Sequence, residues 1–207
     1  MRPLRLCLLC AAVLTSVSAT HATTVVPPEF PDLVSSSDYV IRGKVVSLTN
    51  EIRQRDGREV PFTLAEIAVS EVIAGTPPQK VVLTMLGGKT SDGGELVVEG
   101  VPRFVVGDDS IFFVKNNGTN FYPLRGVMHG LYPVRRDKAT GREYVARANG
   151  LPLSATAEVG LPMAEGAMAQ ELRKHIKVSD ALSVAEFKQS IRETRAAAVK
   201  GEKNNAN

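Results

Sequence analysis

Residues 37–46 read SDYVIRGKVV, and this stretch decides the fold that we expect. Successive side chains of a β-strand point to opposite faces, so Arg42 and Lys44 share a polar face, and the residues that alternate with them form an apolar one. The apolar face carries Tyr39, Ile41 and Val45. Gly43 falls on the same face, and a glycine inside a strand is typical of a tight coil or a close backbone approach, as at a barrel corner. The stretch therefore predicts a strongly bent strand over 39–48.

Further short strands follow this one, with turn signals between them. The expected strands cover residues 62–73, 81–86, 96–98, 110–115, 121–124, 131–135 and 143–146. Asp56-Gly57 is a hairpin signal, and we expect a polar hairpin connection over residues 50–59. Turns recur about every 8–15 residues, which is typical of all-β domains. The predicted fold is therefore mainly β.

Composition divides the chain into five parts. We expect a signal peptide at residues 1–22 and a β-barrel domain at 23–149. Residues 150–163 are rich in glycine, proline and small side chains, which predicts a linker or edge segment. We expect a helical appendage at 164–200 and a disordered tail at 201–207.

The first helix of the appendage is expected over residues 164–176. Its apolar stripe is spaced four residues apart and includes Met168 and Leu172. From Arg173 onward there are eight Lys/Arg against four Asp/Glu, whereas residues 23–172 hold fifteen against eighteen. A slightly acidic body thus carries a basic tail, which we interpret as a solvated helix face rather than a site for an anionic surface.

The second helix is expected from a capping box to about Lys200. In Ser183-Val184-Ala185-Glu186, the serine caps the helix and the glutamate reaches back to it. The helix that follows is too short to be stable in isolation, so its apolar stripe must pack on the barrel. We expect Phe187 to anchor it, with Lys188 and Arg192 facing solvent.

The N-terminus has the three-part pattern of a secretory signal peptide. Arg2 and Arg5 precede an apolar core at residues 6–14, and small residues follow. The core is shorter than the ~20 apolar residues that span a bilayer. We expect export to the periplasm or the medium, with cleavage after Ala22 in preference to Ala19.

Cleavage would change the composition of the chain. Cys7 and Cys10 both lie in the leader, so the mature protein would have neither disulfides nor thiolate metal sites. The formal net charge would fall from +3 to +1 with the loss of Arg2 and Arg5. This balance argues against nucleic acid as a partner. No second apolar run is present to serve as a stable membrane anchor.

Candidate chemical residues are few. His129 and His175 remain after cleavage, and neither stands in an HxxxH, HExxH or HxH pattern. We interpret His129 as a turn or rim residue and His175 as the end of a helix, where a cation is favourable. Asp108 and Asp109 are adjacent in a turn, which favours solvated carboxylates over an acid–base pair.

Glycine-rich and serine-rich stretches do not add a site. Gly87-Gly88 and Gly93-Gly94 lack the Lys-Ser/Thr and the helix that a phosphate loop needs. The serines of VSSSD are explained by capping. Asn117-Gly118-Thr119 is a glycosylation sequon. The sequence thus predicts no catalytic, cofactor-binding or metal-binding residue.

The opening strand resembles the first strand of the netrin-like, or tissue-inhibitor-of-metalloproteinases, fold. That family opens a five-stranded OB-type barrel with an Asp-apolar-Val-apolar-Arg-small-Lys-Val strand. The resemblance covers about residues 33–134 and implies an OB-like barrel with additional short strands and C-terminal helices. The same order resembles a group of exported bacterial proteins of undefined role. The stretches that carry it are SDYVIRGKV, IAVSEVIAGTPPQKVVLTML, PRFVVGDDSIFFV, GLYPV and LSVAEFKQSIR.

The likeness does not extend to the inhibitory mechanism. The eukaryotic inhibitors chelate the zinc of their protease through an N-terminal cysteine, and the expected mature chain begins near Thr23 without any cysteine. We therefore expect a non-catalytic exported binding or accessory protein whose partner is a protein or a cell-envelope component. A protease inhibitor acting through the loop Lys89–Gly94 is the alternative. An enzyme of an unrecognised class is the third reading.

Overall fold

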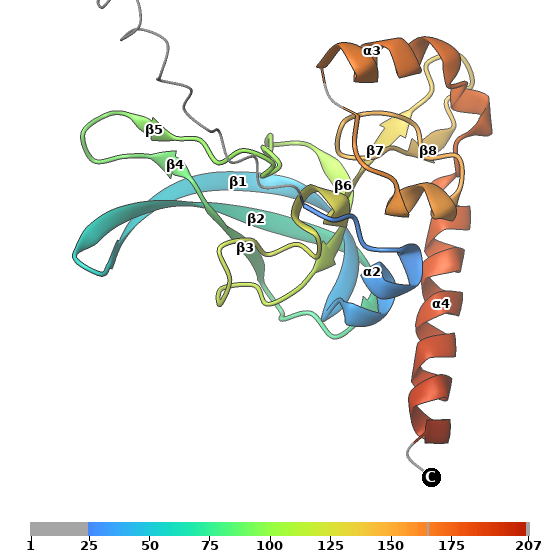
Figure 1. Ribbon diagram of the computed structural model, residues 1–207, viewed down its shortest axis with the longest axis horizontal. Coiled ribbons are helices and arrows are strands. Elements are labelled where there is room, and N and C mark those ends of the chain that lie inside the picture. The colour runs from blue at the N-terminus through green and yellow to red at the C-terminus, as the bar shows by residue number, and fades with distance from the viewer. Residues whose placement is uncertain (1–24, 165, 206–207) are drawn as a thin grey trace, which may run out of the picture.

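The computed structural model describes residues 25–164 and 166–205, so the expected leader lies outside the described residues. The fold is mainly β, as the sequence predicts, because strands hold more of the described residues than helices do. Six strands form one antiparallel sheet in the order β3-β2-β1-β6-β7-β8, and two short strands pair beside it (Figure 1). The strands are β1 (Tyr39–Arg55), β2 (Arg58–Gly75), β3 (Val81–Leu86), β4 (Gly88–Lys89), β5 (Glu95–Leu96), β6 (Asp109–Val114), β7 (Leu131–Arg136) and β8 (Glu143–Val145).

β1 and β2 form a long hairpin that projects beyond the rest of the sheet (Figure 1). Residues 39–44 of β1 pair with both β2 and β6, whereas the later part pairs with β2. The chain reverses at Asp56 and Gly57, whose φ angles of 49° and 73° suit a two-residue hairpin turn. The predicted turn is confirmed. The polar connection expected over residues 50–59 is wrong, because its residues stay paired up to that turn.

At Gly43, the opening strand lies too close to β2 to leave room for a side chain. The pairing of β1 with β2 shifts register between Arg42 and Gly43, as at a β-bulge, which bends a strand. A Cβ atom at Gly43 would lie 2.6 Å from Cγ2 of Ile67 and 2.8 Å from the carbonyl oxygen of Ala68. Both distances are shorter than the contact optimum of about 3.5–4.0 Å. The missing side chain therefore lets β2 approach, and the expected bend is confirmed.

β6 is buried on both faces and separates two hydrophobic clusters. Ile111 and Phe113 belong to the cluster beneath the helices. Phe112 and Val114 belong to the cluster that β1, β2 and β3 enclose. All four side chains are fully buried. A continuous apolar run is what a strand covered on both sides requires.

The described strands leave the sheet open, in contrast to the closed five-stranded barrel that we expected. The free edge of β3 meets the loop after β6 instead of another strand. The Asn117 amide donates to the carbonyl oxygen of Val82 at 2.7 Å and accepts from the N–H of Thr84 at 3.1 Å. The N–H of Leu86 donates to the carbonyl oxygen of Phe121 at 2.8 Å. These bonds satisfy the edge without a ladder, so no closing strand is needed.

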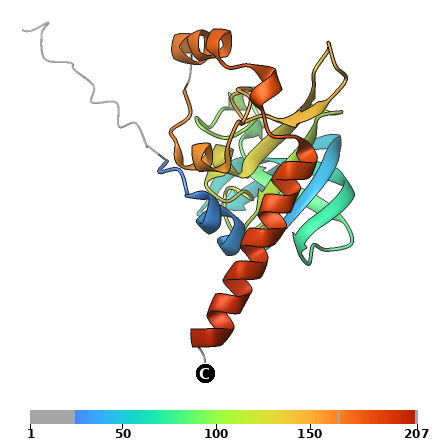
Figure 2. The same cartoon turned by 90° about the vertical axis from the view of Figure 1, so that its right-hand side faces the viewer.

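α2 (Phe30–Ser36) and α4 (Val184–Asn205) lie side by side on one face of the sheet (Figure 2). The predicted capping box is confirmed: the N–H of Glu186 donates to Oγ of Ser183 at 3.2 Å, and the N–H of Ser183 donates to the Glu186 carboxylate at 2.8 Å. Phe187 is fully buried and anchors α4 as expected. Its ring contacts those of Phe30, Phe113 and Tyr132.

The expectation that Lys188 faces solvent is wrong, because its side chain is 19% exposed, whereas that of Arg192 is 46% exposed as expected. Both donate to the carboxylate of Glu71 on β2, at 2.6 and 2.5 Å respectively. The hydrogen bond from Lys188 is the main reason that the pKa of Glu71 is lowered. Arg195 donates to the carbonyl oxygens of residues 34, 35 and 37, which satisfies the end of α2. Basic residues of α4 thus hold it to the body.

Three expectations for the C-terminal part are corrected. Residues 150–163, expected as a linker or edge segment, place Leu153 and Val159 in the core. α3 (Gly166–His175) buries Ala169 and leaves Met168 67% and Leu172 40% exposed, because the face with the small side chain meets the body. α4 continues through the first part of the expected disordered tail, to Asn205.

The contacts of Gly43 yield a stability prediction. We expect Gly43→Val to lower the free energy of unfolding by about 1–3 kcal/mol, because the new side chain overlaps β2. The midpoint of urea denaturation measures this loss. Ala68→Val is the matched control, since Ala68 is exposed on the adjacent strand. Equal midpoints for Gly43→Val and wild type would show that the strands separate there at no cost.

Candidate functional site

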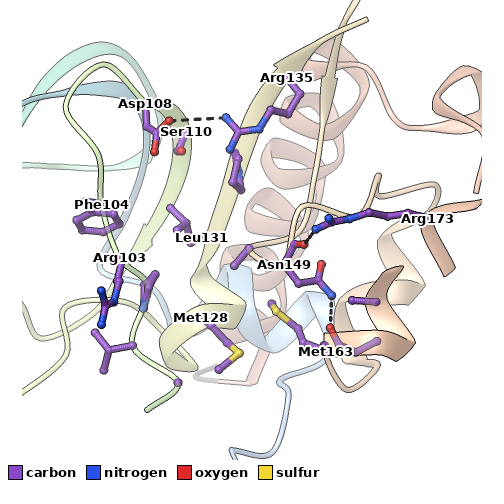
Figure 3. Close-up of a pocket in the computed structure, with 18 of the residues that line it drawn as sticks. Arg103, Phe104, Asp108, Ser110, Met128, Leu131, Arg135, Asn149, Met163 and Arg173 are labelled. Atoms are coloured by element: carbon purple, nitrogen blue, oxygen red, sulfur yellow. Dashed lines mark hydrogen bonds and ion pairs between the residues drawn. The ribbon is translucent and has the colours of Figure 1, made fainter. Parts of the chain in front are cut away.

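A cavity of about 490 Å³ lies between the sheet and α3 (Figure 3). The loop at residues 100–104 forms one side, β6 and β7 form the back, and the turn at Ala148–Asn149 and α3 form the other side. Phe104 holds the loop in place, because its ring packs edge-on against that of Phe112 on β6, with 5.8 Å between the ring centroids. Strands, loop and helix from distant parts of the sequence therefore build one site.

Part of the cavity wall is apolar. In Figure 3, Phe104 lies at the left, Leu131 lies near the centre, and the thioethers of Met128 and Met163 lie below Leu131. Flexible methionine side chains adapt to ligands of irregular shape. This part of the wall suits the hydrocarbon portion of a ligand.

Three arginines line the same space, and we call it the arginine cavity. Arg103 comes from the loop, Arg135 from β7 and Arg173 from α3 (Figure 3). The carboxylate among the lining residues is Asp108, which lies 3.8 Å from Arg135. That separation is longer than a direct hydrogen bond, for which about 2.7–3.2 Å is usual. The lining is therefore rich in positive charge.

Asn149 connects α3 to the rest of the cavity wall. Its side-chain amide donates to the carbonyl oxygen of Ala164 at 2.9 Å, and its backbone carbonyl oxygen accepts a hydrogen bond from Arg173 (Figure 3). Ala169 faces the cavity from the buried side of α3. The position of this helix therefore depends on polar bonds and small residues, which leave room for a ligand.

His129 is not at the rim as we expected. It lies in a 3₁₀ turn, Val127–Gly130, as the glycines around it predict, but its side chain is buried. Burial, together with the charge of Arg147, lowers the pKa of His129 to about 4. Its Nδ1 has no hydrogen-bond partner among the described residues. His175 ends α3, as predicted, and is exposed beside Glu171.

Asp109 is ion-paired rather than solvated, contrary to expectation, whereas Asp108 stays 37% exposed at 3.8 Å from Arg135. Asp109 accepts hydrogen bonds from Arg42, the shortest at 2.7 Å, and Arg42 also donates to Glu143 at 3.0 Å. The hydrogen bond to Asp109 raises the pKa of Arg42. Burial acts to raise the pKa of Glu143, but the hydrogen bond and charge of Arg42 lower it overall. This network joins β1, β6 and β8, so its role is structural.

The remaining sequence candidates have structural positions. Gly87-Gly88 leads into the two-residue strand β4 and lines a second cavity of about 270 Å³ beside the loop at 100–104. Gly93-Gly94 closes the turn between β4 and β5, where the N–H of Thr90 donates to the carbonyl oxygen of Gly94 at 3.0 Å. The amide of the sequon residue Asn117 bonds to β3, so a glycan there would break that edge.

Within residues 25–164 and 166–205, no group of three or more His, Cys, Asp or Glu side chains could hold a metal ion. No helix in this part of the chain is long and apolar enough to cross a membrane.

Comparison with known proteins adds no family assignment. A scan against protein-family models finds no match, and a search of curated proteins finds none either. The functional argument therefore rests on the geometry of the arginine cavity.

Sequence reasoning missed Arg103, Arg135 and Arg173. They are 32 and 38 residues apart along the chain and belong to no motif. Their approach depends on how α3 and the loop fold against β7, which no local pattern encodes. The glycines and the proline around Arg103 are typical of a loop, and this loop was the feature of the sequence that could have pointed to the site.

The burial of His129 predicts a pH-dependent stability. Its pKa is about 4 in the folded protein against an ordinary 6.5, so the unfolded chain binds the proton first. The stability that a neutral His129 contributes is present above pH 6.5 and is lost as the pH falls toward 4. We expect His129→Gln to flatten the stability curve in this window, measured by urea denaturation at several pH values.

His175→Gln is the matched control for this measurement. Its side chain is 74% exposed at the end of α3. We expect this variant to keep the slope of the wild-type curve. If His129→Gln kept the slope as well, another group would be responsible for it.

Proposed function

We propose that this protein is an exported, non-catalytic binding protein that holds a small ligand in the arginine cavity. The observation that carries the proposal is the cavity itself, which combines an apolar wall with a few convergent polar groups. Its volume of about 490 Å³ lies within the range of about 300–1,000 Å³ that is usual for small-molecule sites. Binding is the role that this arrangement supports best.

The chemistry of the lining favours binding over catalysis. Guanidinium groups stay protonated near neutral pH, so they hold charge in place and do not transfer protons. Asn149 and Gln170 contribute amides, which donate and accept hydrogen bonds without ionising. The carboxylate of Asp108 faces Arg135. These groups can orient a ligand through charge and hydrogen bonds, which is what a binding site requires.

We predict an exported mature chain that begins after Ala22. This prediction rests on the leader pattern, in which a basic start and an apolar core precede small residues. Mass spectrometry of the protein from periplasm and medium measures the N-terminus. A mature protein that still begins at Met1 and stays in the cytosol would overturn the export part of the proposal.

A second candidate function is loop-mediated protease inhibition, which the likeness to netrin-like inhibitors suggests. The supporting observation is that the exposed loop Lys89–Gly94 is held in place at its base. The Asn50 side chain exchanges two hydrogen bonds of 2.8 Å with the backbone of Lys89, and Ser91 donates to Glu59. Inhibition assays against panels of metalloproteases and serine proteases test this candidate.

The binding proposal predicts that filling the arginine cavity abolishes ligand binding. Ala169 faces the cavity from α3, so we expect Ala169→Leu to occupy space that a ligand needs. The measurement is a ligand-observed NMR screen with neutral, cationic and anionic fragments. We expect wild type to bind a subset that Ala169→Leu does not bind, with bound compounds recovered chemically unchanged.

Ala167→Leu is the matched control for that screen. It adds the same side chain to an exposed position of the same helix, outside the cavity lining. We expect it to bind the same fragments as wild type. The proposal fails if no fragment distinguishes Ala169→Leu from Ala167→Leu, and recovery of altered compounds would indicate an enzyme.

A further inference from the structure

The lining of the arginine cavity holds more basic than acidic residues. Three arginines and one carboxylate, Asp108, are among the lining residues. Arg135 is 3.8 Å from that carboxylate, and Arg173 donates to a backbone carbonyl, which carries no net charge. For Arg103, the structure records neither a hydrogen bond nor an ion pair within the described residues. An anion beside Arg103 would therefore gain a charged partner.

This positive charge is local to the cavity. Residues 23–172 carry fifteen Lys/Arg against eighteen Asp/Glu, so the body as a whole is slightly acidic. Elsewhere, Arg42 pairs with Asp109 and Arg192 with Glu71, whereas Arg142 and Arg195 donate to backbone carbonyl oxygens. Three arginines beside a single carboxylate therefore make the cavity lining basic within a body that is slightly acidic.

The apolar part of the wall limits the type of anion. Met128, Leu131, Met163 and Phe104 would be left against water if a bare inorganic anion were bound. Hydrocarbon that covers them gains free energy in proportion to the apolar area removed from water. A ligand that matches the whole lining must therefore have an acidic group and an apolar body.

We propose that the ligand of the arginine cavity is a small amphipathic anion, a carboxylate attached to a hydrocarbon chain or ring. Its acidic group lies at the side of the cavity formed by Arg103, and its apolar body lies along Leu131, Met128 and Met163. This inference rests on the proposed binding function and specifies the chemical class of the ligand.

The test measures the affinities of matched probes by isothermal titration calorimetry with the mature protein. Decanoate carries both parts, 1-decanol lacks the charge, decyltrimethylammonium reverses it, and acetate lacks the chain. We expect decanoate to bind at least about 10-fold more tightly than each of the others, because it alone makes both the charged and the apolar contacts. Raising the salt concentration to about 0.5 M should weaken decanoate more than decanol.

Single substitutions locate the acidic group. We expect Arg103→Ala to weaken decanoate binding about 5-fold, Arg103→Lys to weaken it less, and neither to change the binding of decanol. Arg58→Ala is the matched control. Arg58 lies at the tip of the long hairpin, away from the cavity lining, so its replacement removes the same charge without touching the site.

Each outcome of these measurements decides one of the two proposals. Equal affinities for decanoate and decanol, tighter binding of the cation, or equal losses in Arg103→Ala and Arg58→Ala overturn the amphipathic anion. So does acetate binding as tightly as decanoate. If these probes fail while the fragment screen still finds ligands that Ala169→Leu excludes, the inference falls and the binding function stands. If the screen also finds none, the binding function itself has failed.

Discussion

The structure depends on the burial of β6 between two hydrophobic clusters. Ile111 and Phe113 need cover on one face of this strand, and Phe112 and Val114 need it on the other. The long β1–β2 hairpin and β3 curve around one face, and α2 and α4 close the other. A strand with apolar side chains on both faces cannot be left at a surface, so the remaining elements are arranged around it.

Polar contacts then fix how these covering layers meet. Glu71 of β2 binds two cations of α4, and Arg195 of the same helix satisfies the end of α2. Arg42, Asp109 and Glu143 tie three strands of the sheet together. Such pairs contribute little individually when exposed, but partly buried pairs specify which side chains of two packed elements face each other.

The class of fold and several of its local features could be predicted from the chain. The Asp56-Gly57 turn, the capping box before α4 and the anchoring by Phe187 depend on residues that are neighbours in sequence or on one helical stripe. The stripe of α3 was misread, because Met168 and Leu172 have helical spacing but Ala169 makes the contact. Periodicity shows that a helix has an apolar side, and the shape of the opposing surface decides which side packs.

The sequence by itself determined the mainly β class, the bend at Gly43, the turn chemistry and the docking of the last helix. These follow from alternation, backbone freedom and capping, which act over a few residues. Only the tertiary structure decided that the sheet stays open, that Asn117 satisfies the edge of β3, and that Arg103, Arg135 and Arg173 surround one cavity. Those features join residues tens of positions apart, and their geometry depends on how whole elements pack, which no local pattern of side chains specifies.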